Sequence, residues 1–121
     1  MRYLLILVLT VSWLSGCATQ QQRFPAADMA RSSTVEFMQP YQLSRTDMEF
    51  VDLGPVRGES CQRPLLEGQA SQEEAMIAMK LAAADKQANR IVLKRCQQDS
   101  KGGCSVRWWC EGTAFQAQPL Q

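Results

Sequence analysis

The stretch CQQDSKGGCSVRWWC, residues 96–110, decides the fold because it carries three of the five cysteines in the chain. The apolar run IVL at residues 91–93 comes before it, and apolar positions continue after it to Phe115. Gly102 and Gly103 stand between the two apolar segments, where a glycine pair is typical of a turn. The pattern therefore predicts strand, turn and strand. The other two cysteines, Cys61 and Cys17, lie far upstream.

The N-terminus has the features of a secretory leader. Arg2 is followed by an uncharged run, LLILVLTVSW, at residues 4–13, which is too short for a membrane span of about 20 residues. The run ends in LSGC at residues 14–17, which resembles the bacterial lipobox; an ordinary signal peptide with a chance cysteine is the alternative. We expect cleavage before Cys17 and lipidation of its thiol. By resemblance to sorted lipoproteins, Ala18 in place of aspartate favours the outer membrane.

Size, charge and cysteine content narrow the class of protein. Removal of residues 1–16 leaves 105 residues, enough for one domain, in which 12 basic residues face 12 acidic ones. This balance gives no reason to expect a nucleic-acid partner. The chain has no histidine, the commonest general base and metal ligand, and we predict no enzyme, cofactor or metal site. In an oxidising compartment the four cysteines after Cys17 are expected to form disulfides.

The pattern along the chain predicts three regions. Residues 1–16 are the signal peptide, residues 17–34 are a lipidated N-terminus with a flexible polar tether, and residues 35–121 are a periplasmic domain. In this domain we expect strands at 35–38 and 50–56, the second bent at Gly54-Pro55, and a turn at 57–60. Further strands are expected from Ile91 and over 105–115, with a frayed tail at 116–121.

A single helix is predicted between the two strand pairs. Ser71 followed by Glu74 is a capping box, and apolar positions recur every three or four residues from there to about Gln87. Asn89 is expected to end the helix in a left-handed conformation. The fold class is therefore α+β, in the order β-β-α-β-β, with one helix packed on a small antiparallel sheet stapled by two disulfides.

Geometry leaves two disulfide pairings open. Cys104 and Cys110 are six residues apart on one expected strand, which separates them by about 20 Å, whereas a disulfide needs Cα atoms within about 7 Å. Either Cys61 pairs with Cys104 and Cys96 with Cys110, or Cys61 pairs with Cys110 and Cys96 with Cys104. No C-x-x-C spacing is present, which argues against a zinc site and against a thiol oxidoreductase.

Three groups of residues match a known family. The first is DLG at 52–54 with Val56, Gly58 and SCQ at 60–62; the second is Ala88, Asn89, Val92, Leu93 and Cys96; the third is Gly103, Cys104, Cys110, Gly112 and Ala114. With the lipobox, these residues resemble the RcsF family of outer-membrane lipoproteins, which sense envelope stress for the Rcs phosphorelay. The resemblance covers roughly residues 35–115, and the cysteine order with DLG-V-G-SCQ is its most specific part.

The resemblance implies a pairing and a set of partners. Family members pair the first cysteine with the third and the second with the fourth, which gives Cys61–Cys104 and Cys96–Cys110 here. It implies a periplasmic domain that engages an inner-membrane inhibitor, an IgaA-type protein, and that associates with outer-membrane β-barrel proteins and their assembly machinery. The chain departs from the family in its tether, which is short and contains Pro25 as its one proline, and in a less basic helix.

Two functions from different classes compete. One is a signalling lipoprotein that acts by regulated protein contact; the other is a structural or accessory outer-membrane lipoprotein without a signalling role. An enzyme is a distant third, with Asp52, Glu59, Glu73 and Glu74 as its nearest approach to a carboxylate pair. On a strand, Trp108 is expected to face the core. Arg107, Trp109 and Glu111 are expected on the other face, where Trp109 either packs under the tether or a loop or serves as a partner contact.

Overall fold

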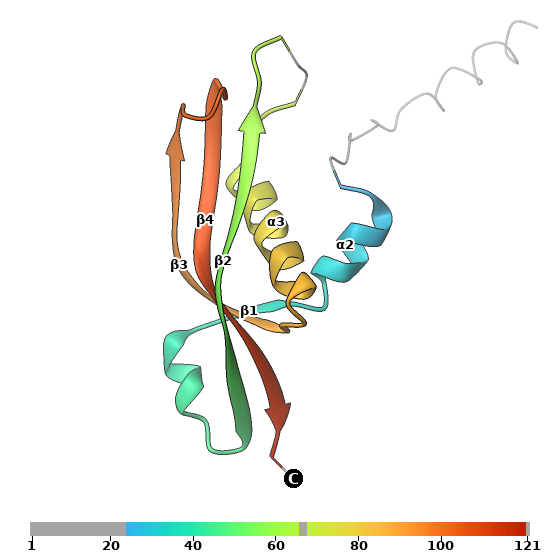
Figure 1. Ribbon diagram of the computed structural model, residues 1–121, viewed down its shortest axis with the longest axis vertical. Coiled ribbons are helices and arrows are strands. Elements are labelled where there is room, and N and C mark those ends of the chain that lie inside the picture. Colours follow the sequence, from blue (N-terminus) through green and yellow to red (C-terminus); the bar gives the residue numbers. More distant parts are fainter. Residues whose placement is uncertain (1–23, 66–67, 121) are drawn as a thin grey trace, which may run out of the picture.

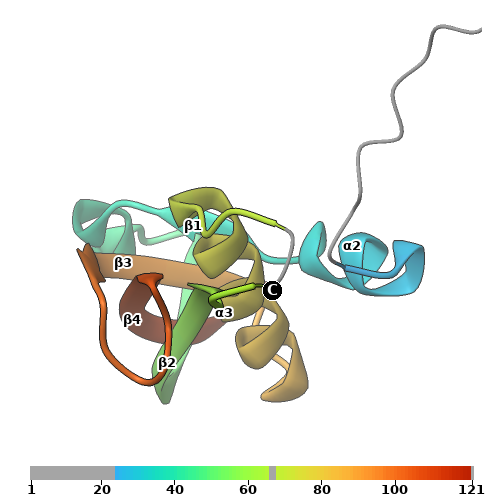
Figure 2. The same cartoon turned by 90° about the horizontal axis from the view of Figure 1, so that it is seen from above.

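The computed structural model describes residues 24–65 and 68–120, which form one four-stranded sheet with the two α-helices on one side (Figures 1 and 2). The strands lie in the order β1-β3-β4-β2. In chain order the elements are α2 (Ala26–Ser32), β1 (Glu36–Met38), the 3-10 helix η2 (Pro40–Ser44), β2 (Met48–Gln62), α3 (Gln72–Asp85), β3 (Arg90–Asp99) and β4 (Val106–Pro119).

The α+β class is confirmed, but the sheet is mixed rather than antiparallel. β4 pairs antiparallel with β3, with which it forms a hairpin, and with β2 on its other side. β1 pairs parallel with β3, with Phe37 opposite Ile91. The prediction of an all-antiparallel sheet is wrong at this edge because β2 and α3 lie between β1 and β3 in the chain. A connection of that length brings β3 back in the same direction as β1.

β2 and β4 are longer than expected and pair along their whole length. The turn predicted at residues 57–60 is wrong, because β2 runs unbroken from Met48 to Gln62. The bend predicted at residues 54–55 is taken up by a register shift at Gly54, whose φ of 96° suits glycine and whose amide donates to Asp52 Oδ1 at 2.8 Å. The predicted frayed tail is also wrong: β4 continues to Pro119, opposite Met48.

α3 begins as predicted and ends slightly early. The Ser71 hydroxyl accepts a hydrogen bond from the Glu74 amide at 3.1 Å, so Ser71 is the N-cap. The helix ends at Asp85, and Gln87, with φ 64°, takes the left-handed position that was predicted for Asn89. Asn89 instead bridges to β4: its side-chain amide donates to the Ala117 carbonyl at 3.0 Å and accepts from the Ala117 amide at 2.7 Å.

α3 lies very close to β2 because a glycine stands at the contact. A Cβ atom on Gly58 would come 2.1 Å from the Ala75 carbonyl oxygen and 2.3 Å from the Met79 nitrogen, both backbone atoms of α3. The core forms between this helix and the sheet. Its fully buried members include Val35, Ala75, Met79, Ala83, Ile91, Cys110 and Ala114.

Both disulfides have the pairing that the family resemblance implied. Cys61 is bonded to Cys104, with 5.5 Å between Cα atoms, and Cys96 to Cys110, with 4.0 Å. The first joins the end of β2 to the turn before β4, and the second crosses from β3 to β4. They close sequence spans of 43 and 14 residues, for which chain-entropy estimates give about 4 and about 3 kcal/mol of stabilisation.

The predicted tether is partly helical. Residues 26–32 form α2, which packs against α3, so the folded part begins well before residue 35. The signal peptide and Cys17 lie outside the described residues. Within residues 24–65 and 68–120, no helix has the length and apolar character needed to cross a membrane.

Candidate protein-contact surface on the open face of the sheet

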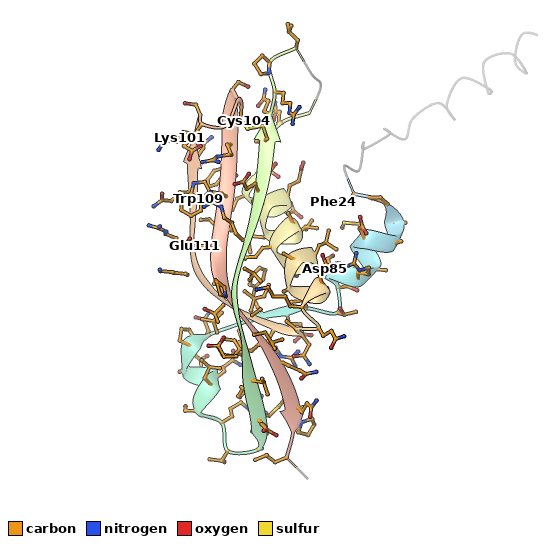
Figure 3. All side chains as sticks on the ribbon, in the orientation of Figure 1. Phe24, Asp85, Lys101, Cys104, Trp109 and Glu111 are labelled. Atoms are coloured by element: carbon orange, nitrogen blue, oxygen red, sulfur yellow. A yellow bond between two sulfur atoms is a disulfide. The ribbon has the colours of Figure 1, made fainter. Side chains whose placement is uncertain are left out.

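The two faces of the sheet have different surroundings. Gly58 on β2 and Cys110 on β4 face α3, since Gly58 touches the helix backbone and Cys110 is fully buried. Successive side chains on a strand point to opposite faces, so their neighbours point away from α3. Figure 3 shows Trp109 and Glu111 on this open side. We call the following set the Trp109 face: Arg57 and Glu59 on β2, Arg95 and Asp99 on β3, and Arg107, Trp109 and Glu111 on β4.

Trp109 lies at the centre of this face beneath arginine side chains. Its residue is 7% exposed, although it is on the side away from the helix. The Arg57 guanidinium carbon lies 4.4 Å from the ring centroid, and that of Arg95 lies 5.0 Å from it. Both distances are within the range of cation–π contacts. Among residues 24–65 and 68–120, the ring is therefore covered by arginine side chains of the neighbouring strands, whereas one interpretation of the sequence had placed it under the tether or a loop.

Asp99 gathers hydrogen bonds at the end of the face next to the hairpin turn. The Arg107 guanidinium donates to both carboxylate oxygens, at 2.8 and 2.7 Å, and Trp109 Nε1 donates to Oδ2 at 3.1 Å. The Lys101 amide donates to Oδ1 at 3.1 Å. These donors, chiefly Arg107, hold the pKa of the Asp99 carboxyl well below its usual value. Asp99 is thus ionised at neutral pH and fixes the Arg107 side chain, whose pKa is raised in turn.

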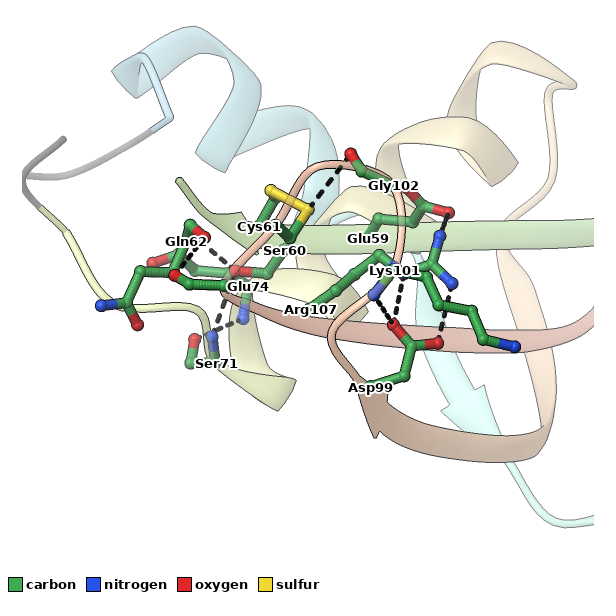
Figure 4. The surroundings of a disulfide bond; sticks show 12 residues. Glu59, Ser60, Cys61, Gln62, Ser71, Glu74, Asp99, Lys101, Gly102 and Arg107 are labelled. Carbon is green, nitrogen blue, oxygen red and sulfur yellow. Dashed lines mark hydrogen bonds and ion pairs between the residues drawn. A yellow bond between two sulfur atoms is a disulfide. The ribbon is translucent and has the colours of Figure 1, made fainter. Parts of the chain in front are cut away.

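The same end of the sheet is closed by the first disulfide. Figure 4 shows the Cys61–Cys104 bond beside the turn at Gly102, with Asp99 and Arg107 nearby. The Ser105 amide and hydroxyl both donate to the Gln62 carbonyl, at 2.7 and 2.8 Å, which ties the start of β4 to the end of β2. The disulfide and these hydrogen bonds therefore link β2 to β4 at this end of the Trp109 face, which makes local unfolding there less favourable.

The opposite end of the face carries more positive charge. Arg95 Nε donates to Glu111 Oε1 at 2.7 Å, and the Lys94 ammonium lies 3.9 Å from the same oxygen. Arg57 Nη2 lies 3.2 Å from Glu59 Oε1. The side chains of Arg57, Lys94 and Arg95 are each about half exposed or more. Ion pairs this exposed contribute little to stability, so their charges are free to exchange partners with an approaching surface.

The structure places the three predicted contact residues on one face but gives them different exposure. Arg107 and Glu111 have side chains that are 16% and 25% exposed, and Trp109 is less exposed than either. Their role in partner contact stays a prediction. Trp108, expected to be a core residue, packs against the core cluster from its edge and is only partly buried.

Sequence reasoning missed four members of the face: Arg57, Glu59, Arg95 and Asp99 come from strands whose register with β4 was not known. The alternation of side chains along each strand was visible, but without the pairing it does not say which residues flank Trp109. The carboxylates weighed for an enzyme do not gather: the Asp52 carboxylate accepts from the Gly54 amide, Glu59 lies beside Arg57 and Arg107, and the Glu74 carboxylate accepts from the Ser60 hydroxyl at 3.3 Å.

A second surface feature lies on the side of α3 next to β1. It is an open groove of about 460 Å³ lined by Phe37, Gln72, Glu73, Met76, Ile77 and Lys80. The Lys80 ammonium lies 5.1 Å from the centre of the Phe37 ring. The groove offers apolar surface, whereas the Trp109 face offers charge.

Comparison with known proteins decides the family. The sequence profile of the RcsF lipoprotein family matches residues 14–118, which include LSGC and all four disulfide cysteines. The chain belongs to the RcsF lipoprotein family. No curated protein matches the chain. Family membership indicates a membrane-anchored lipoprotein, and lipidation of Cys17 stays a prediction.

Proposed function

We propose that this RcsF-family protein is an outer-membrane lipoprotein that senses envelope stress. In this proposal its domain signals by direct contact with an inner-membrane inhibitor of the Rcs phosphorelay, an IgaA-type protein. Association with outer-membrane β-barrel proteins and their assembly machinery belongs to the same proposal. The observation that carries it is the family match, which spans the lipobox and the whole disulfide-stapled domain.

The Trp109 face supports a role in protein contact. It is a strand-borne surface on which Asp99 fixes the Arg107 side chain and two arginines pack on one indole ring. A preorganised surface loses little side-chain entropy when a partner binds, which favours affinity. Trp and Arg are also the residue types that dominate binding energy at protein interfaces.

The lipid anchor is tested by Cys17→Ser. Without the thiol that receives the lipid, the protein should leave the membrane fraction or keep its signal peptide. Subcellular fractionation with mass spectrometry measures both. A Cys17→Ser protein that still sediments with the outer membrane at an unchanged mass would contradict the anchor.

The signalling role is tested with a Rcs-dependent reporter. Deletion of the gene should abolish the reporter response to outer-membrane damage, and the wild-type gene should restore it. A reporter that responds equally without the gene would favour the alternative, an accessory outer-membrane lipoprotein. That alternative is favoured by one observation: α2 packs against α3, so few residues separate Cys17 from the folded part, which keeps the docked domain close to its anchor.

A further inference from the structure

α2, the first described element of the chain, has few interactions that hold it against the rest of the domain. It has seven residues, no side-chain N-cap hydrogen bond, and a single buried residue, Ser32. Helices of this length are not stable on their own, so contact with α3 must hold it. The described polar link to α3 is an ion pair between Arg31 and Asp85, whose side chains are 47% and 69% exposed. Exposed pairs of this kind are individually weak.

The Arg31–Asp85 pair meets a specific electrostatic need of α3. Asp85 is the last residue of α3, where the helix dipole disfavours negative charge, and the last turn of α3 contains no basic residue. Lys86 follows, but its ammonium donates to the Pro55 carbonyl at 2.9 Å, on the β2 side. Arg31 therefore brings the positive charge that the end of α3 lacks. The pair therefore adds to the packing of α2 on α3 and favours docking of α2.

The chain is held firmly from Val35 onward. Val35 is fully buried, and the Glu36 amide donates to the Asn89 carbonyl at 3.1 Å as β1 begins. Ser33 and Thr34 between them are exposed. Release of α2 would thus separate residues 24–34 from α3 and leave β1 and the core in place.

The position of α2 sets how far the domain can lie from a lipid on Cys17. With α2 docked, seven residue steps join Cys17 to Phe24, which span at most about 24 Å. With α2 released, 18 steps join Cys17 to Val35, which span at most about 60 Å. Release of α2 thus adds 11 extensible residue steps (18 − 7) between the anchor and the part of the chain that stays docked, although the chain length is unchanged.

We propose that α2 is a latch that controls the reach of the domain from its membrane anchor, and that the Arg31–Asp85 pair keeps it closed. The proposal rests on the lipid anchor of the proposed function. Closed, the latch holds the Trp109 face near the anchoring membrane. Open, it lets the same face approach a partner on the opposite side of the periplasm. Opening of the latch also explains how a protein with a short tether can contact a partner far from its anchor.

The test uses Asp85→Arg in the full-length lipidated protein in phospholipid vesicles. This change places two arginines side by side where α2 meets α3, which opposes docking of α2. It also puts a positive charge at the C-terminus of α3, where the helix dipole favours it, so the melting temperature of the domain should not fall. Hydrogen exchange at the amides of residues 29–33, which follow the unbonded first amides of α2, should rise about threefold to tenfold. The double variant Arg31→Glu/Asp85→Arg restores opposite charges and should return exchange toward the wild-type rate. Arg63→Glu, a charge reversal in the exposed loop after β2, is the control and should leave α2 unchanged.

A second readout measures reach. A fluorescent amino acid at position 101, in the hairpin turn, and an acceptor on the vesicle surface should show lower energy transfer in Asp85→Arg and recovery in the double variant. Unchanged exchange in Asp85→Arg would overturn the latch. Faster exchange with unchanged energy transfer would overturn its control of reach. If Cys17→Ser protein stays on the vesicles, the anchor of the proposed function fails, and that result is read independently of exchange in α2.

Discussion

Replacement of Gly58 by alanine tests the close packing of α3 on β2. Gly58 lies in the middle of β2, opposite Cys110, and faces α3. An added Cβ would come 2.1 Å from the Ala75 carbonyl oxygen and 2.3 Å from the Met79 nitrogen. Real Cβ atoms do not approach within 3.0 Å of such atoms, so either the helix or the strand must move by about 1 Å.

The expected cost is large because both neighbours are backbone. Flexible side chains could rotate away, but the Ala75 and Met79 backbone moves only with α3 as a whole. Overpacking in a core typically costs about 1–3 kcal/mol, and we expect the Gly58→Ala variant near 3 kcal/mol. For a domain of this size, each kcal/mol lowers the melting temperature by about 4–8 °C, which predicts a fall of roughly 12–24 °C.

Thermal unfolding followed by circular dichroism measures the effect, with the disulfides intact. Glu59→Ala, one residue along the same strand but on the open face, is the matched control and should lower the melting temperature by only a few degrees. A Gly58→Ala variant that melts within about 4 °C of the wild type would refute the close approach of α3 to β2.

Three further predictions follow from the sheet. The double variant Cys96→Ser/Cys110→Ser should lose about 3 kcal/mol in denaturant unfolding, as its 14-residue span requires, and a loss under 1 kcal/mol would contradict a constraining role. The Asp99 carboxyl has a lowered pKa in the folded state, so its contribution to stability is present above an unfolded pKa of about 3.9 and is lost as pH falls below it. Asp99→Asn should therefore reduce the loss of unfolding free energy at acidic pH. An unchanged loss at acidic pH would count against the Arg107 interaction. Trp109→Ala should cost about 3–5 kcal/mol in the same unfolding assay, since the residue is 7% exposed, and a near-neutral change would mean that the ring is not a packing residue.

Much of the fold could be predicted from local patterns. The Ser71 cap, the helix that follows it and the hairpin around Gly102-Gly103 each depend on residues close together in sequence, and each is present. What local patterns missed depends on distant contacts. β2 is straight through residues 57–60 because β4 pairs with it residue by residue, and α2 is helical because α3 lies beside it.

The candidate surface was only partly predictable for the same reason. Arg107, Trp109 and Glu111 share a face by strand alternation alone, which the sequence reveals. That Arg57 and Arg95 cover the ring, and that Asp99 binds its nitrogen, depends on strand register, which the sequence does not specify. The disulfide pairing was partly predictable from the sequence alone. Strand length excluded one pairing, and the family resemblance selected between the other two.

Site-specific photocrosslinking tests the central claim, contact through the Trp109 face, most directly. Gln97 and Gln98 are adjacent, exposed residues of the same type on β3, opposite Trp109 and Trp108, so they point to opposite faces of the sheet. A photoreactive amino acid at either position changes the chain equally. Under outer-membrane damage, position 97 is predicted to crosslink to the IgaA-type protein and position 98 is not. Equal crosslinking at both positions, or crosslinking at position 98 alone, would contradict contact through this face.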